Sequence, residues 1–312
     1  MKTALWGAWH VHADGYLRTA LGLSEVVGVY EDNAEWKNAL AAKYNVKAFD
    51  SAEELLASDA EAVLVCTESS AHADTIIRIA EAGKHIFTEK VMTLTNADAQ
   101  RVKDAIVKNG VRFVISFPQK YFASHQTVKS IVDLGEIGKI NYLRFRNCHS
   151  GSSDAWLPAH FYDGNACGGG AMIDLGAHGM YLTDWFLGLP DGYRSSFTLA
   201  CPGGLNAEGL EDNAVTVMTY KDGAIAVNET GFVSVGCPAS LEIGGLDGYI
   251  VCSENKVIKR TRTTGNKPVE VPLMEALPSP LEQFLTGNIL PGCGIEEALH
   301  LTEMMVGAYA NR

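Results

Sequence analysis

The sequence predicts an α/β protein of two domains: an N-terminal domain built on a doubly wound parallel sheet, and a C-terminal α/β domain with a large, mostly antiparallel sheet. Over residues 1–118 short apolar runs alternate with amphipathic stretches, which is the pattern of a parallel sheet covered by helices on both faces. From 193 to 271, β-rich segments punctuated by glycine follow one another instead. The length of 312 residues also exceeds that of most single cores. We therefore expect domains at 1–118 and 119–312.

The elements of the first domain follow from its apolar runs and its glycines. Buried strands are expected at 3–6, 26–30, 62–66, 85–88 and 111–116, with helices at 12–22, 33–44, 70–82 and 95–109. Gly83 and Gly110 follow two of these helices, where glycine can adopt the left-handed conformation that ends a helix. In such a sheet the ligand lies at the carboxyl ends of the strands.

The second domain is expected to contain one helix that carries reactive groups. This reactive helix is expected at 170–187. It follows a helix at 119–134, a strand at 139–147 and an irregular segment at 148–169. The chain is expected to close with helices at 279–286 and 295–310. Asp174 and His178 share a face at i,i+4, and Tyr181 and Trp185 continue it. We expect the helix to pack through a separate apolar stripe, formed by Leu175, Leu182 and Phe186.

Composition excludes several classes of protein. The formal charge of -12, with no basic cluster, argues against a nucleic-acid partner. No apolar run approaches the roughly 20 residues of a membrane span, and the N-terminus does not resemble a signal peptide, so we expect a cytoplasmic protein without a membrane partner. The seven cysteines are scattered and include no C-x-x-C, which indicates neither a disulfide framework nor a thiolate zinc site.

The turn after the first strand resembles a degraded dinucleotide-binding fingerprint. Of the G-x-G-x-x-G pattern only Gly7 is present, because Trp9 stands at the second glycine, with His10 next to it. Glu31 lies 24 positions beyond Gly7 and is followed by Asp32, a spacing that suits an acid bound to the adenosine ribose and argues against a 2′-phosphate. An N-terminal helix cap is an equally good interpretation of these two acids.

Two more strands end in polar residues. Thr67, Ser69 and His72 follow the strand at 62–66, and Glu89 and Lys90 follow the strand at 85–88. A lysine at this edge can polarise a substrate oxygen, although a solvated ion pair is the commoner role for a Glu-Lys sequence.

Histidines provide the remaining candidates. An imidazole that titrates near neutrality can accept the proton of a substrate hydroxyl, and a neighbouring carboxylate can orient it; the alternative for Asp174 and His178 is a helix cap and a buried pair. His149, Trp156, His160 and Tyr162 are assigned to a substrate wall, with a surface loop or interface as the alternative. Several histidines could converge, but His10 and His12 cannot be assigned to one face, and we expect no metal site.

Four elements in this order resemble the Gfo/Idh/MocA family of sugar and polyol oxidoreductases. They are the A-G-K-H-I-F-T-E-K run at 82–90, the segment at 67–72, the L-G-E-I-G-K-I element at 134–140 and the G-G-G-x-x-x-D-x-G-x-H run at 168–178. The resemblance extends over essentially the whole chain. It departs from the family pattern at Trp9, at Val91, which replaces the usual proline, and at Lys120, which stands near a frequent arginine.

The resemblance implies an N-terminal Rossmann domain for a dinucleotide and a C-terminal domain for substrate and oligomerisation. It further implies that Lys90, Asp174 and His178 are catalytic and that Lys120 contacts substrate. The implied reaction is oxidation of a secondary alcohol of a sugar, cyclitol or polyol. The implied cofactor is NAD rather than NADP. The alternatives are a glycosidase of the same family that uses NAD transiently and a sensor that binds cofactor without turnover. A homodimer or homotetramer through the C-terminal sheet is expected, because a large sheet must cover an apolar face.

Overall fold

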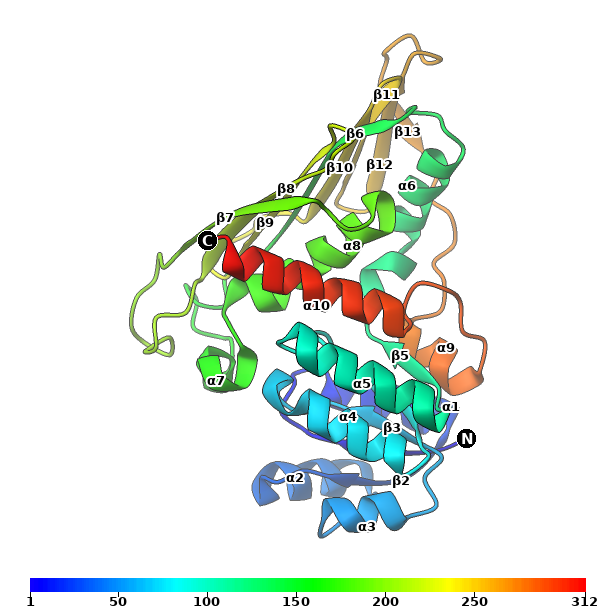
Figure 1. The fold of residues 1–312 in the computed structure, drawn as a ribbon, viewed down its shortest axis with the longest axis vertical. Coiled ribbons are helices and arrows are strands. Elements are labelled where there is room, and N and C mark those ends of the chain that lie inside the picture. The colour runs from blue at the N-terminus through cyan, green and yellow to red at the C-terminus, as the bar shows by residue number, and fades with distance from the viewer. The chain divides into compact units, whose positions relative to one another are not determined.

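The computed structural model describes residues 1–312, and the chain divides into two compact units (Figure 1). The first unit comprises Met1–Ser116 and Pro278–Thr302, and the second comprises Phe117–Leu277 and Glu303–Arg312. The expected division at residue 118 does not include the return of the chain at Pro278. This return could not be read from local pattern, because it depends on which core the final helices cover.

The first unit is the expected doubly wound domain, in which one parallel sheet is interleaved with helices. Its strands pair in the order β2-β1-β3-β4-β5, all parallel. The strands are β1 (Lys2–Trp6), β2 (Glu25–Tyr30), β3 (Ala62–Val65), β4 (His85–Thr88) and β5 (Phe113–Ile115). The helices are α1 (Ala13–Leu23), α2 (Ala34–Tyr44), α3 (Ala52–Ala57), α4 (His72–Glu81), α5 (Asn96–Asn109) and α9 (Pro280–Thr286), with the first half of α10 (Ile295–Ala310).

The strand order fixes where a ligand can bind in this unit. The chain winds from β1 outward to β2 and then returns to place β3 on the other side of β1. In doubly wound sheets the crevice for a ligand lies outside the carboxyl ends of the strands at this reversal. The segments that follow β1 and β3 are therefore the ones expected to border the cofactor.

The returning segment completes the core of the first unit. The Phe284 ring on α9 lies 6.0 Å from the Phe87 ring on β4, and the Ile115 amide of β5 donates to the Cys293 carbonyl at 2.9 Å. Phe87 and Phe284 are fully buried. The helices expected at 279–286 and 295–310 are present, but the first of them belongs to the N-terminal unit and not to the C-terminal domain in which the sequence analysis placed it.

The second unit is built on an eight-stranded sheet, as expected mostly antiparallel. The order is β13-β12-β11-β10-β6-β9-β8-β7, and only β6 and β9 are parallel. The strands are β6 (Ile140–Cys148), β7 (Gly192–Thr198), β8 (Asn213–Thr219), β9 (Ile225–Gly231), β10 (Ser240–Gly245), β11 (Gly248–Ser253), β12 (Lys256–Thr261) and β13 (Val269–Val271). Figure 1 shows α6 (Ala123–Asp133) and α8 (Ala177–Leu187) along these strands.

Alternation along the strands separates the two faces of this sheet. Leu143 and Phe145 of β6 are fully buried, whereas Tyr142, Arg144 and Arg146, which alternate with them, are half-buried. The buried side belongs to the face against which α6 and α8 pack. The other face carries half-buried residues that no helix of this unit covers to the same extent.

Three elements differ from the sequence expectations. Helix α3 was missed, although Ser51 caps it by accepting from the Glu54 amide at 3.1 Å. The helix expected at 119–134 is divided into a 3₁₀ turn, η2 (Pro118–Tyr121), and α6. The segment at 148–169 contains two short helices, η3 (Ala159–Tyr162) and α7 (Gly164–Cys167). Among the helices of the structure, none combines the length and the apolar character that a membrane crossing requires.

Candidate functional site

The turn between β1 and α1 requires glycine at its first position. Gly7 has φ +98°, and a Cβ there would lie 2.4 Å from the Thr67 amide nitrogen at the end of β3. The Gly7 amide donates to the Tyr30 carbonyl at 2.8 Å, and the His10 amide donates to the Cys66 carbonyl at 3.1 Å. The turn is thus held against the ends of two strands at the sheet reversal, which is where a dinucleotide fold binds its pyrophosphate.

Glu31 supports this same turn. Its carboxylate accepts from the Ala8 amide at 2.6 Å and from the Asn33 amide at 2.9 Å. The helix cap of α2 is Asn33, which accepts from two amides of the first turn, so neither Glu31 nor Asp32 takes the capping role that the sequence left open. Asp32 instead accepts from the Tyr30 hydroxyl at 2.5 Å. A carboxylate has about four acceptor positions, so Glu31 retains capacity for ribose hydroxyls.

A buried carboxylate lies directly behind the turn. Glu89 is 1% exposed, and its Oε1 lies 2.7 Å from His12 Nδ1 and accepts from the Tyr16 hydroxyl. Oε2 accepts from the Lys90 amide at 3.0 Å. Tyr16 also lies 2.7 Å from the Ser116 hydroxyl. In the sequence His12 was considered only as a metal ligand and Tyr16 was not singled out, because both approach Glu89 only through the fold.

Two histidines and a lysine lower the pKa of this carboxylate. Burial by itself raises the pKa of Glu89, but His10, His12 and Lys90 outweigh it and hold the pKa well below its ordinary value. His10 Nδ1 lies 4.0 Å from Glu89 Oε1. The ligand-type atoms of His10, His12 and Glu89 all lie within 4.8 Å of one another, so the structure brings onto one face two histidines that the sequence could not place. The expectation that no metal binds stays a prediction.

The other predicted cofactor residues fall into two groups. Thr67 and Ser69 lie in the segment after β3, and Lys90 follows β4 with its side chain buried; its peptide bond to Val91 is cis. His72 is fully buried instead, with Nδ1 2.8 Å from the Val91 carbonyl and Nε2 3.1 Å from the Thr67 carbonyl. Both ring nitrogens therefore face backbone, and His72 joins the two strand-end loops rather than presenting itself to a ligand as expected.

The helix expected at 170–187 begins with a π-helical turn. This turn, η4, covers Met172–Gly176 and leads directly into α8. A π turn widens the helix and replaces the i→i−4 hydrogen bonds by i→i−5 bonds, and such turns are frequent at functional sites. Asp174 lies within the wide turn and His178 follows it in regular helix. The α-helical spacing assumed for this pair therefore does not apply across the turn.

The start of η4 is held by Glu211 and Tyr309. Glu211 Oε1 accepts from the Gly170 amide at 2.9 Å and from the Met172 amide at 3.2 Å, and the Tyr309 hydroxyl donates to the same oxygen. A Cβ at Gly169 would lie 2.0 Å from the Tyr309 hydroxyl, and one at Gly170 would lie 2.0 Å from the Glu211 carbonyl. The glycine run thus permits the close approach of these two anchors.

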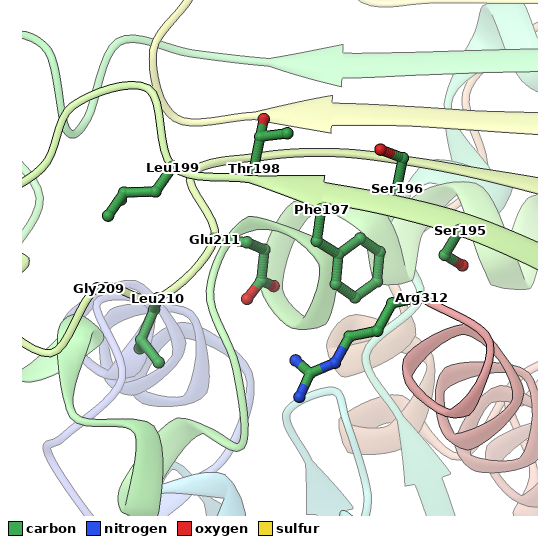
Figure 2. Close-up of a pocket in the computed structure, with 9 residues that line it drawn as sticks. All are labelled: Ser195, Ser196, Phe197, Thr198, Leu199, Gly209, Leu210, Glu211 and Arg312. Atoms are coloured by element: carbon green, nitrogen blue, oxygen red, sulfur yellow. The ribbon is translucent and has the colours of Figure 1, made fainter.

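Glu211 also borders a hollow in the second unit. Figure 2 shows its carboxylate together with Phe197 and Arg312. The hollow has a volume of about 480 Å³. Burial, followed by the proximity of Glu211, raises the pKa of Tyr309 well above its ordinary value, so its hydroxyl remains a donor to Glu211.

His178 is bound to a tyrosine on its own helix. Its Nδ1 lies 2.8 Å from the Tyr181 hydroxyl, which also accepts from the Gln119 amide at 3.2 Å. The Tyr181 ring stacks on Phe117 with centroids 4.3 Å apart, and Lys120 Nζ lies 5.9 Å from the Tyr181 centroid. The predicted residues His178 and Lys120 therefore both lie next to Tyr181. The i,i+3 spacing of His178 and Tyr181 was the available signal.

Packing of α8 differs from the predicted stripe. Of Leu175, Leu182 and Phe186 only Leu182 is fully buried, and the other two are half-buried. The buried positions are instead Ala177, Met180, Tyr181, Leu182 and Thr183. Tyr181, expected to continue the reactive face, is 1% exposed. Leu175 lies within the π turn, and Phe186 lies next to the end of α8, so neither shares the buried environment of Leu182.

The remaining predicted substrate residues lie in the segment that follows β6. The His149 ring stacks on Phe232 with centroids 4.8 Å apart, and Trp156, 54% exposed, lies 4.6 Å from His149. Tyr162 is buried and its hydroxyl lies 2.8 Å from the Ser152 hydroxyl. His160, in η3, contacts the ring of Phe161 at 5.2 Å. These side chains organise the segment between β6 and the glycine run.

Comparison with known families identifies the two halves of the chain. Residues 1–117 match the model of the oxidoreductase family with an NAD-binding Rossmann fold, and residues 125–251 match that of the GFO/IDH/MocA C-terminal domain. Together they cover more than half of the sequence. The chain belongs to the Gfo/Idh/MocA oxidoreductase family. The resemblance and the fold class expected from the sequence are confirmed.

Two curated relatives act on sugars or cyclitols by name. The chain is 34% identical to inositol 2-dehydrogenase of Salmonella typhimurium over 145 residues, which are 45% of this chain and 43% of the relative. It is 25% identical to 1,5-anhydro-D-fructose reductase of Ensifer adhaerens over 233 residues, which are 73% of this chain and 68% of the relative. The chain spans about half to two thirds of the length of the curated relatives it matches.

Solved structures of several oxidoreductases share the whole fold. Levoglucosan dehydrogenase, in complex with NADH and levoglucosan, superposes with a TM-score of 0.83 at 16% sequence identity, with 100% of this chain and 96% of that chain covered. At this level of identity the likeness establishes the fold alone.

Proposed function

We propose that this member of the Gfo/Idh/MocA family is an NAD-dependent oxidoreductase that acts on a secondary alcohol of a sugar, cyclitol or related polyol. The observation that carries the proposal is the arrangement around His178, whose Nδ1 is bound to Tyr181 beside the buried Lys120. A histidine held at one nitrogen is oriented to exchange a proton at the other. The names of the curated relatives support the class of substrate.

The residues of the first unit fit a dinucleotide. The close approach at Gly7, where a Cβ would lie 2.4 Å from Thr67, holds the turn and the start of the following helix at the ends of β1 and β3, where a pyrophosphate would bind, although Trp9 replaces the second glycine. Thr67, Ser69 and Lys90 lie at neighbouring strand ends and would border the nicotinamide half. When bound, the cofactor supplies a nicotinamide ring that exchanges a hydride with the carbinol carbon of the substrate.

We further propose that NAD is preferred to NADP. Glu31 ends β2 with a carboxylate that already orders the Ala8 amide, and Asp32 adjoins it. A ribose with two free hydroxyls can donate to Glu31, whereas a 2′-phosphate would place a second negative charge against it.

In the proposed mechanism the protein moves a proton and stabilises charge. His178 accepts the hydroxyl proton at Nε2, because Nδ1 faces Tyr181. Asp174 lowers the energy of the imidazolium that forms, and Tyr181 keeps the ring in place. The Lys90 ammonium stabilises the negative charge that the substrate oxygen acquires as its proton leaves, before loss of the hydride completes the neutral carbonyl. In the reverse direction His178 returns the proton.

We also propose that two or four copies associate through the uncovered face of the eight-stranded sheet. Val217 of β8 and Val227 of β9 are directly opposed on that face and half-buried. Beside them Arg144 lies 2.8 Å from Glu229 and 3.6 Å from Glu242. A surface with apolar residues next to both signs of charge can be complementary to a second copy of itself.

A screen of sugars, cyclitols and polyols with purified protein tests the activity. Formation of NADH is followed by absorbance in the presence of each alcohol, and its consumption in the presence of the matching ketone. We expect turnover with at least one polyol and lower activity with NADP. Cleavage of a glycosidic bond without net formation of NADH would identify the NAD-assisted glycosidase instead. Tight binding of NAD without any turnover would identify a sensor.

A further inference from the structure

We propose that Asn228 is a positioning residue, whose buried side-chain amide sets the π-helical turn that presents Asp174 and His178. The inference rests on the proposed roles of those two residues. It concerns a strand residue more than 40 positions away from them, which no motif of the sequence singled out.

The amide of Asn228 is bound to the end of the π turn. Asn228 is on β9 and is 0% exposed, and its Nδ2 donates to the Gly176 carbonyl at 2.7 Å. The same nitrogen lies 3.8 Å from Met172 Sδ, at the other end of η4. Thr230, two positions later on β9, donates to the Ala171 carbonyl at 3.3 Å. One strand therefore supplies donors to both ends of the turn.

A π turn needs such donors. In regular α-helix each carbonyl accepts from the amide four residues later, and a π turn displaces its carbonyls from that ladder. A carbonyl that is buried without a partner destabilises the fold, so the turn persists only where a donor reaches it. The Gly176 carbonyl lies at the junction of the π turn and α8, and Asn228 provides a side-chain donor to it. His178 is two residues beyond this point.

The oxygen of the same side-chain amide, Oδ1, indicates that Asn228 has a role other than stabilising the fold. Its orientation is fixed, because only the amino group can bind a carbonyl oxygen. Oδ1 is then buried with no hydrogen-bond partner. An unsatisfied buried acceptor lowers stability, and an apolar side chain would avoid it. The hydrogen bond from Asn228 Nδ2 to the Gly176 carbonyl is thus kept although Oδ1 is left without a partner.

Glycine at 179 makes room for this amide. A Cβ at Gly179 would lie 2.0 Å from Asn228 Oδ1. The side chain of Asn228 therefore lies directly against the helix at the position after His178, and at Gly176 a Cβ would lie 2.4 Å from Met172 Sδ. Close contacts therefore lie on both sides of His178, with the Met172 thioether at Gly176 and with the Asn228 amide at Gly179.

The test compares Asn228→Val with Thr216→Val. Thr216 on β8 is the direct cross-strand neighbour of Asn228 and is also 0% exposed, but its hydroxyl lies 2.9 Å from that of Ser195 and not on the π turn. Both variants lose a buried polar group from the same sheet. The titration of His178, followed by NMR of ¹³C-labelled histidine and assigned with His178→Asn, is measured without substrate. The kcat with a substrate from the screen and the Kd for NADH are measured in parallel.

We expect Asn228→Val to shift the His178 titration and to lower kcat about 10- to 100-fold, since small displacements of catalytic groups have effects of this order. The Kd for NADH should stay within about twofold, because the cofactor residues are in the other unit. Thr216→Val should retain the His178 titration and at least about half of kcat. If Asn228→Val does not fold, Asn228→Thr, which keeps a hydroxyl on a strand-forming side chain, takes its place in the same comparison.

Two results would overturn the proposal: an Asn228 variant with the His178 titration of the original protein, or a Thr216→Val protein with the same losses. A changed titration with unchanged kcat would also overturn it. If no substrate is found in the screen, the proposed function fails, and the NMR comparison still decides whether Asn228 sets the environment of His178.

Discussion

The Tyr181 hydroxyl lies 2.8 Å from Nδ1 of His178, and it simultaneously accepts from the Gln119 amide. Its ring is fixed by stacking on Phe117, so the hydroxyl has little freedom to move. The imidazole is therefore oriented by a neighbour on its own helix that is itself held by η2. The expectation that Asp174 also orients His178 stays a prediction.

Replacement of Tyr181 by phenylalanine tests this relationship. Tyr181→Phe retains the stacked ring and removes the oxygen that binds His178. We expect kcat to fall about tenfold, a part of the 100- to 10,000-fold that a general base contributes, and the base limb of the pH profile to shift. Tyr220→Phe is the matched control, because Tyr220 donates to the Gly188 carbonyl at the end of α8 at 3.1 Å. Equal rates for the two variants would contradict the orienting role.

Removal of the proposed base should affect turnover rather than folding. His178→Asn retains much of the side-chain volume and should lower kcat about 100- to 10,000-fold. Lys90→Met should also lower kcat strongly, with less effect on binding of the adenosine half of the cofactor. His85→Asn, which removes a histidine from β4, serves as the control. Steady-state rates and a thermal melt of each variant separate the outcomes, since near-normal turnover of His178→Asn would show that another group is the base.

The charge of Glu31 should determine the choice of cofactor. Glu31→Gln retains an acceptor for the Ala8 amide and removes the negative charge. We expect the affinity for NAD to fall about tenfold and the discrimination against NADP to decrease. Calorimetric titration with both cofactors measures this, and Glu35→Gln, at the exposed start of α2, is the control. If the ratio of the affinities for NAD and NADP is unchanged in Glu31→Gln, Glu31 does not determine the choice of cofactor.

Acidification should act on the first unit through Glu89. The pKa of Glu89 in the folded protein lies well below its usual value of 4.5, so its ionised form stabilises the fold above that value. This contribution is lost as the pH falls from about 4.5 through the lower folded pKa. Glu89→Gln should therefore be less stable than the original protein at pH 7, and the difference should narrow on acidification. Urea unfolding across this range, with Glu81→Gln as the surface control, measures the difference. If the difference in the free energy of unfolding between the two proteins does not depend on pH, the ionised form of Glu89 does not stabilise the fold.

Association through the sheet should depend on its uncovered face. Val217→Lys places a charge opposite Val227, and we expect it to shift the protein toward monomer with little change in the melting of the single chain. Leu134→Lys, at a 74% exposed position, should leave the mass unchanged. Sedimentation at micromolar concentration measures both. A strict monomer for the original sequence would exclude the proposed oligomer.

Local pattern was sufficient for the regular elements. The apolar runs placed β1 to β5 within a few residues, and Gly83 and Gly110 have the expected positive φ. The alternation after 193 predicted the antiparallel strands. These features depend on neighbouring residues, so periodicity and turn chemistry reveal them.

Features that depend on distant contacts were not visible. The π turn at Met172–Gly176 is held by Asn228 and Glu211, which are far along the chain, and it separates Leu175 from the regular helix that carries the rest of the predicted apolar stripe. His72 was placed correctly at a strand end, but the Val91 carbonyl that binds it was not predictable. The role of Tyr181 required knowledge of where Gln119 lies.

The return of the chain at Pro278 has a consequence for synthesis on the ribosome. Phe87 in β4 and the edge of β5 are covered by Phe284 and Cys293, which are translated only after Phe117–Leu277 of the second unit. The nascent first unit therefore waits with part of its apolar core exposed while about half of the protein is still being made. A fragment that ends at residue 118 would retain that exposed surface permanently, so we expect it to aggregate unless Pro278–Thr302 is supplied with it.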